Sequence, residues 1–117
     1  MTTTKTPAKA LIMSGYGINS EMETREALMR AGMASDIVHI NDLIAGEKAL
    51  SHYRLMVFPG GFSYGDDTGA GNAYANRVRN NLWSDLKDFL AGDNLVLGIC
   101  NGFQILANLG LIPAFEQ

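Results

Sequence analysis

Short apolar runs alternate with amphipathic or polar stretches along this chain. Four of the runs are continuous rather than alternating, and they lie at residues 8–13, 36–40, 54–58 and 94–97. Continuous apolar runs of this length predict strands that are covered on both faces, which is the pattern of a parallel sheet. Because helical stretches separate the runs, we expect βαβ units with right-handed crossovers.

The first predicted helix begins at Ser20 and runs to Ala31, where Gly32 ends it. Glu23 stands three residues after Ser20, which is the spacing of a capping box. After the second strand, residues 41–42 (Asn-Asp) are expected to cap a short helical turn.

Two more helices are predicted, over residues 81–90 and 103–109. The apolar residues of the first of these share one face at helical spacing, and they are Leu82, Leu86, Phe89 and Leu90. Together the elements predict an α/β fold: a flavodoxin-like, doubly wound parallel sheet with strand order 2-1-3-4. In such a sheet the functional groups gather at the carboxyl ends of the strands.

Composition narrows the class of protein. The chain has 117 residues, of which 47% are hydrophobic, and a net charge of −3, so one globular domain is expected. Residues 1–7 have no apolar segment like that of a signal peptide, and we expect them to be a disordered lead-in to a domain over residues 8–117. Neither nucleic acid nor a membrane is an expected partner, and a cytoplasmic location fits a chain whose single cysteine forms no internal disulfide.

That cysteine, Cys100, stands between the fourth predicted strand and the last predicted helix, with Gly98 and Gly102 on either side. A strand that turns sharply into a helix leaves little room at the corner, and two flanking glycines remove the side chains that would clash there. The pattern predicts a nucleophile elbow, with the thiol raised above the sheet beside the amino end of a helix. The alternative for an isolated cysteine is a buried structural role.

A second motif, Pro-Gly-Gly at residues 59–61, follows the third strand. Glycines have no side chain, so the backbone N–H groups of this motif are accessible and could form an oxyanion hole. The same motif alone also forms plain tight turns or phosphate sites. In a doubly wound sheet the ends of strands three and four lie side by side. We therefore expect the amides of Gly60, Gly61 and Asn101 to flank Cys100 in a geometry suited to acyl transfer.

No general base is evident. His39 lies in the second strand, where a packed or edge role is expected, and His52 precedes the third strand at its amino end. Residues 66–67 (Asp-Asp) are interpreted as loop residues, so no metal site is expected. Residues 15–17 (Gly-Tyr-Gly) lack the third glycine of a dinucleotide-binding loop.

Gly-Ile-Cys-Asn-Gly-Phe-Gln at residues 98–104 resembles the nucleophile motif of the class I glutamine amidotransferases. Pro-Gly-Gly-Phe-Ser-Tyr-Gly-Asp at residues 59–66 is similar to the glutaminases of phosphoribosylformylglycinamidine synthase, as are residues 17–21 and 38–43. The resemblance implies that glutamine is hydrolysed to glutamate and ammonia. The ammonia would pass to a formylglycinamidine ribonucleotide synthetase partner in purine biosynthesis, either a separate subunit or a fused domain.

The same resemblance assigns roles to single residues. Cys100 would be the nucleophile that forms a γ-glutamyl thioester. Gly61 and Asn101 would supply the oxyanion hole. The positions beside the substrate would be Gly60, Phe62 and Gln104. No cofactor is implied for this domain, because ATP and Mg²⁺ are used by the partner synthetase.

Length is where the chain departs from the family pattern. Family glutaminases are about twice as long and carry their catalytic His and Glu in a later segment, so the chain is expected to be an N-terminal half, truncated and with little activity alone. The fourth strand would then present an apolar edge, and we expect self-association through it. The alternatives are a DJ-1-like cysteine-elbow hydrolase or stress protein, and a non-catalytic binding domain of the same fold.

Overall fold

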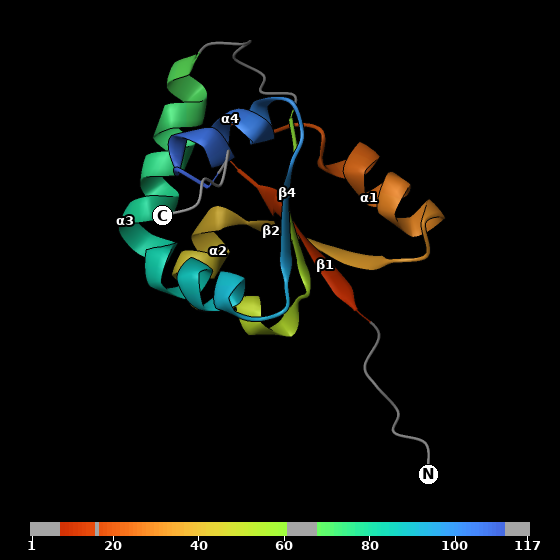
Figure 1. The fold of residues 1–117 in the computed structure, drawn as a ribbon. Helices are drawn as coiled ribbons and strands as arrows, with labels where there is room; N and C mark the ends of the chain where they lie inside the picture. The colour runs from red at the N-terminus through yellow and green to blue at the C-terminus, as the bar shows by residue number, and fades with distance from the viewer. Residues whose placement is uncertain (1–7, 16, 61–67, 112–117) are drawn as a thin grey trace.

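The structure is a computed structural model that describes residues 8–15, 17–60 and 68–111. Its strands are β1 (Lys9–Ser14), β2 (Ala34–His39), β3 (Leu55–Phe58) and β4 (Leu95–Gly98). Its helices are α1 (Glu21–Arg30), α2 (Ile40–Ile44), α3 (Thr68–Ala91) and α4 (Asn101–Asn108), with a 3-10 turn η1 (Leu50–His52). Strands and helices therefore alternate as the sequence predicts (Figure 1).

The four strands form one parallel sheet in the order β2-β1-β3-β4, which confirms the predicted fold class and strand order. Leu11 pairs with Met56, and Met56 pairs with Val96, so these three side chains lie on one face of the sheet. All four strands run in the same direction, and their carboxyl ends form a single rim. Of the predicted site residues, Gly60 and Cys100 each follow within two residues of the end of a strand, β3 and β4 respectively, at this rim.

The main core fills one face of the sheet. In Figure 1, α1 lies on one side of the sheet, and α2, α3 and α4 lie on the other. The fully buried side chains of the second side come from β1, β3, α2, α3 and α4, and the largest are Leu11, Met13, Ile40, Met56, Phe58, Tyr74, Leu86 and Ile105. Burial of apolar surface on this scale is the main favourable contribution to folding.

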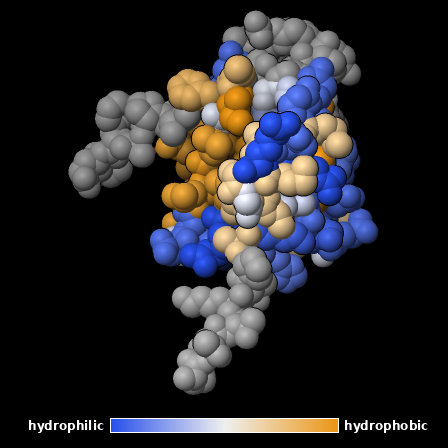
Figure 2. Space-filling view, turned by 90° about the vertical axis from the view of Figure 1, so that its right-hand side faces the viewer, coloured by the Kyte–Doolittle hydropathy of each residue, from blue (hydrophilic) through white to orange (hydrophobic). Residues whose placement is uncertain are grey.

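The opposite face of β4 is not covered by any described residue. Leu95, Leu97 and Ile99, here called the β4 apolar strip, are 72%, 46% and 40% exposed. Figure 2 shows apolar side chains gathered on the surface beside the polar outer side of α1. The prediction that helices cover both faces therefore holds for β1 but is wrong for β4 within the described residues. The predicted apolar edge at β4 is confirmed.

Helix α3 begins at Thr68, thirteen residues before the predicted start at residue 81. Its first turns contain Gly69, Gly71 and Asn72, which are weak helix formers and hide the pattern. Packing overrides propensity here, because Tyr74 and Val78 are buried on the stripe that continues through Leu82. None of the helices within residues 8–15, 17–60 and 68–111 has the combination of length and apolar character that a membrane crossing requires.

The two predicted caps are corrected by the structure. Ser20 is the N-cap of α1, but its side chain makes no capping hydrogen bond; instead Thr24 donates its hydroxyl to the Ser20 carbonyl oxygen at 2.8 Å. In α2 the cap is His39, whose Nδ1 accepts a hydrogen bond from the Asn41 amide at 3.0 Å. Asn41 and Asp42 lie inside this helix rather than before it.

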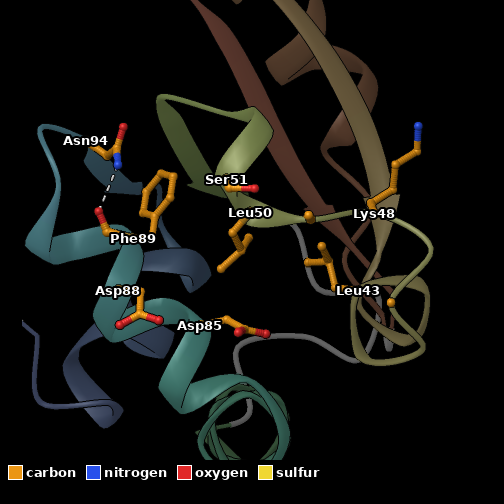
Figure 3. Close-up of a pocket in the computed structure, with 10 residues that line it drawn as sticks. Leu43, Lys48, Leu50, Ser51, Asp85, Asp88, Phe89 and Asn94 are labelled. Atoms are coloured by element: carbon orange, nitrogen blue, oxygen red, sulfur yellow. Dashed lines mark hydrogen bonds between the residues drawn. The ribbon is translucent and has the colours of Figure 1, made fainter.

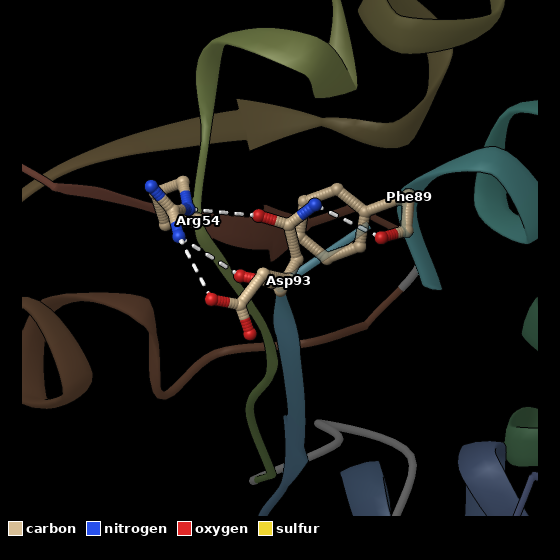
Figure 4. A network of polar contacts seen from close by, with 4 residues as sticks. Arg54, Phe89 and Asp93 are labelled. Carbon is tan, nitrogen blue, oxygen red and sulfur yellow. Dashed lines mark hydrogen bonds and ion pairs between the residues drawn. The ribbon is translucent and has the colours of Figure 1, made fainter. Parts of the chain in front are cut away.

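At the amino end of the sheet, Arg54 fixes the start of β4 beside β3. Its Nε donates to Asn94 Oδ1 at 3.0 Å, and its guanidinium also donates to the Asp93 carbonyl oxygen at 3.0 Å (Figure 4). Asn94 donates in turn to the Phe89 carbonyl oxygen at 2.9 Å, which links this corner to the end of α3. The Leu95 amide donates to the Arg54 carbonyl oxygen at 3.0 Å, so the register between β3 and β4 is set at the first residue of β4.

A second polar cluster ties β1, β2 and the segment before β3 together at the same end. Tyr53 donates its hydroxyl to Asp36 at 2.7 Å, and Lys9 forms an ion pair with Asp36 at 3.0 Å. The hydrogen bond from Tyr53, aided by Lys9, lowers the pKa of Asp36 below its ordinary value. Burial and the nearby carboxylate raise the pKa of Tyr53 to about 12.

Candidate active site

Cys100 stands at the corner between β4 and α4, and it is exposed. Its backbone has φ 51° and ψ −112°, and within the described part of the chain it is the only non-glycine residue with a positive φ. A side chain in such a region costs about 1–3 kcal/mol and persists only where the surroundings enforce it. The buried structural role is therefore excluded, and the predicted nucleophile elbow is confirmed as backbone geometry.

The two flanking glycines are sterically required. A Cβ on Gly102 would lie 1.7 Å from the carbonyl oxygen of Phe58. A Cβ on Gly98 would lie 2.7 Å from both the Gly102 carbonyl oxygen and the Leu106 Cδ1 atom. The start of α4 is thus pressed against the end of β3, which leaves the corner residue to project away from the sheet.

The first turn of α4 lies directly after Cys100. The Cys100 carbonyl oxygen accepts from the Phe103 amide at 2.9 Å, and the Ile99 carbonyl oxygen accepts from the Gly102 amide at 2.8 Å. Asn101 is the first residue of the helix, and its amide has no acceptor within the helix. Amides at the start of a helix are suited to donate to an oxyanion, and this role stays a prediction for Asn101.

Gly60 lies beside the elbow. Phe58 pairs with Gly98, and the Ile99 amide donates to the Phe58 carbonyl oxygen at 3.0 Å, so the strand pairing continues past β4. Gly60 comes two residues after Phe58 and is buried. The other two predicted residues of this loop, Gly61 and Phe62, lie outside the described residues.

Gln104 lies in the first turn of α4 and is half-buried. It lines a shallow hollow of about 150 Å³ together with Phe103, Ala107 and Asn108. The structure therefore places this predicted substrate contact one turn from Cys100, on the same helix, and its role stays a prediction.

Neither histidine of the chain reaches the thiol. His39 ends β2, and β1 and β3 separate that strand from β4, so three strand spacings of about 4.8 Å lie between His39 and the elbow. His39 instead caps α2 and lies over Gly15, where a Cβ would be 2.8 Å from its Nε2. His52 is exposed in η1, before β3 begins. Neither histidine is therefore placed to act as a base at the elbow.

Sequence reasoning missed Tyr74, which lies beneath the rim. Its side chain is 1% exposed, its hydroxyl donates to the Ser14 carbonyl oxygen at 3.0 Å, and its ring packs edge-on against Phe58. The available signal was its position four residues before Val78 on the stripe of α3.

A larger hollow of about 440 Å³ lies at the opposite end of the sheet (Figure 3). Leu50 and Phe89 line it from η1 and α3, and Asp85 and Asp88 stand on the α3 side. Because this hollow lies at the other end of the sheet from Cys100, it is not part of the candidate active site. Among the residues that the structure describes, no group of three or more His, Cys, Asp or Glu side chains could hold a metal ion.

Comparisons with known proteins agree with the geometry. Residues 7–117 match the model of the "CobB/CobQ-like glutamine amidotransferase domain". The chain is 63% identical over 103 residues to "Phosphoribosylformylglycinamidine synthase subunit PurQ" of Methanococcus maripaludis (strain C5), covering 88% of this chain and 38% of that protein. A protein of the same name from Dehalococcoides mccartyi is 45% identical over 105 residues, covering 90% of this chain and 41% of that protein.

A comparison with solved structures also finds a similar chain. "Structure of PurLQS from Thermotoga maritima" contains a chain that superposes with a TM-score of 0.72 at 30% identity, covering 92% of this chain and 46% of that one. The present chain spans about two fifths of the length of the curated relatives that it matches.

Proposed function

This chain belongs to the CobB/CobQ-like glutamine amidotransferase domain family, and on that premise we propose that it carries the nucleophile of the glutaminase component of phosphoribosylformylglycinamidine synthase. The observation that supports this most is the strained, exposed Cys100 between two sterically required glycines. The names of the relatives point to the same enzyme.

The proposed reaction is hydrolysis of the glutamine side-chain amide. The Cys100 sulfur attacks the amide carbon, and the amides of Asn101 and Gly61 hold the negative oxygen of the tetrahedral intermediate. The proton of the Cys100 thiol passes to the amide nitrogen, the C–N bond breaks, ammonia leaves, and a γ-glutamyl thioester remains. Water cleaves the thioester to give glutamate and the free thiol. Gly60, Phe62 and Gln104 are proposed to position the glutamine.

The proposed partner is a synthetase subunit or domain that uses ATP and Mg²⁺ to consume the ammonia, and this domain itself takes no cofactor. Support comes from the relative's name, which calls it a synthase subunit, and from the match to a chain in a PurLQS structure. We also propose self-association through the β4 apolar strip, and a cytoplasmic location, which keeps an exposed thiol reduced.

Labelling of the thiol tests the proposal. A glutamine-analogue electrophile, 6-diazo-5-oxo-norleucine, is expected to modify Cys100, and excess glutamine is expected to slow the modification. Excess asparagine, one methylene shorter, is the matched control and should protect much less. Cys100→Ser should remain unlabelled. Labelling that glutamine does not slow would contradict a glutaminase role and would favour another cysteine-elbow chemistry.

A further inference from the structure

Tyr74 joins the carboxyl ends of the two central strands. Its hydroxyl donates to the carbonyl oxygen of Ser14, the last residue of β1, at 3.0 Å. Its ring meets that of Phe58, the last residue of β3, with centroids 6.2 Å apart and an interplanar angle of 86°. The Tyr74 and Phe58 side chains are both fully buried, so this contact is shielded from water.

Phe58 in turn forms the wall against which the elbow folds. Its carbonyl oxygen accepts a hydrogen bond from the Ile99 amide at 3.0 Å, and Gly102 packs directly on the same oxygen. Tyr74 is therefore linked to Cys100 through Phe58 and through Ile99 and Gly102, the two residues on either side of the corner that contact Phe58.

We infer that Tyr74 is a positioning residue for Cys100. It fixes the position of Phe58 relative to the end of β1, and so holds the elbow in its strained conformation. A residue at φ 51° relaxes unless its surroundings over-determine it. The hydroxyl of Tyr74 supplies part of that constraint from the buried side of the sheet. The inference rests on the proposed function in so far as the position of the thiol matters for glutamine hydrolysis. The reactivity of Cys100 can be measured whether or not that function is correct.

The test compares Tyr74 with a second buried tyrosine at the opposite end of the sheet. Tyr53 is also buried, and its hydroxyl also donates one hydrogen bond, but to Asp36 at the amino end of the sheet. Tyr74→Phe and Tyr53→Phe each remove one hydroxyl from the full chain. The readouts are the second-order rate of Cys100 alkylation by iodoacetamide in native buffer and the urea midpoint of unfolding.

We expect both variants to lower the urea midpoint, and only Tyr74→Phe to slow alkylation, by roughly threefold to tenfold, the factor that corresponds to one hydrogen bond. A rate for Tyr74→Phe within twofold of the parent overturns the inference. Equal slowing in both variants also overturns it, since a general loss of stability would then be the cause.

A double-variant cycle is a second, independent test of the inference. Phe58→Leu removes the ring that Tyr74 contacts and keeps the position apolar. If the two residues act through one path, the double variant slows alkylation less than the product of the two single effects. Fully multiplicative effects would mean that Tyr74 acts elsewhere and would overturn the inference.

Glutamine separates this inference from the proposed function. Should glutamine fail to protect the parent chain from the glutamine-analogue electrophile, the glutaminase proposal fails. The ratio of iodoacetamide rates between Tyr74→Phe and Tyr53→Phe is measured without glutamine, and it decides the role of Tyr74 independently.

Discussion

Gly102 packs on Phe58 so closely that a Cβ at residue 102 would lie 1.7 Å from the Phe58 carbonyl oxygen. This contact joins the start of α4 to the end of β3, and it leaves Cys100 no room to turn inward. The positive φ of Cys100 and its exposure are consequences of the same close approach. The elbow is therefore built by backbone packing rather than by the cysteine itself.

Gly102→Ala is expected to disrupt the elbow. In an open helix the change would stabilise the protein by about 1 kcal/mol through helix propensity. Here the clash with backbone cannot be relieved by a side-chain rotation, and we expect a net loss of about 3 kcal/mol or more. Urea unfolding measures the loss. Gly46→Ala is the control, because a Cβ there meets no atom within 4 Å and only its φ of 84° opposes the change, at about 1 kcal/mol. Similar losses in both variants would argue against the packing described.

Cys100→Gly is expected to stabilise the fold while abolishing labelling. Glycine adopts a positive φ without strain, which removes a strain energy of about 1–3 kcal/mol. Glycine also loses more chain entropy on folding, which destabilises the folded state by about 0.5–1 kcal/mol. Compared with Cys100→Ala, which keeps the strain, the glycine variant should therefore be more stable by about 1 kcal/mol. Equal urea midpoints for the two variants would show that the corner is not strained.

Much of the fold follows from the sequence because the strands are continuous apolar runs. The predicted strand order and strand direction are confirmed. The need for glycine at the corner is predicted from the motif around Cys100, and the close contacts of Gly98 and Gly102 confirm it. The start of α3 was missed because Gly69 and Gly71 weaken the local helical signal, while the burial that stabilises those turns comes from Tyr74 and is tertiary. The cap of α2 was missed for a related reason, since a strand histidine gives no local sign that it will accept from Asn41.

The candidate site could be predicted only in part. Cys100 and its glycines form a local motif, so a strand followed by a helix is enough to place them. The supporting contact between Tyr74 and Ser14 joins residues 60 positions apart, and no short pattern records it. The roles of Gly61, Phe62, Asn101 and Gln104 rest on resemblance, and they remain predictions.

The contact between Tyr53 and Asp36 predicts a stability that falls at both extremes of pH. The pKa of Asp36 is lowered in the folded state, so its contribution is present above pH about 4 and is lost as the pH falls through the folded pKa. The pKa of Tyr53 is raised to about 12, so its contribution is present below pH about 10 and is lost as the pH rises toward 12. The stability difference between the parent chain and Tyr53→Phe should be largest from about pH 5 to 9 and shrink at both ends. Urea midpoints across this range measure it, and a difference that does not vary with pH would contradict the assignment.

Glutamine turnover by this chain alone is expected to be slight. His39 lies across the sheet from the elbow and His52 lies before β3, so neither transfers a proton at Cys100. Without such a group, catalysis falls by several orders of magnitude even where the oxyanion donors remain. Glutamate release is the measurement, with Cys100→Ser as the background. Turnover at the rate of an ordinary enzyme, about 1–1,000 per second, would require a base that the described residues do not offer.

The β4 apolar strip predicts self-association of the isolated chain. Among the described residues β4 is an edge strand, and Leu95, Leu97 and Ile99 expose apolar surface along it. An exposed apolar edge favours pairing with another chain. Leu97→Lys places a charge in the middle of the strip and is expected to shift the sedimentation profile toward monomer. Met22→Lys is the matched control, because Met22 is 64% exposed on α1, away from the edge, and its change should leave the profile as it was. A parent chain that sediments as a monomer at all concentrations would show that the strip does not attract a second copy. An equal effect of both lysines would mean that net charge, rather than this edge, controls association.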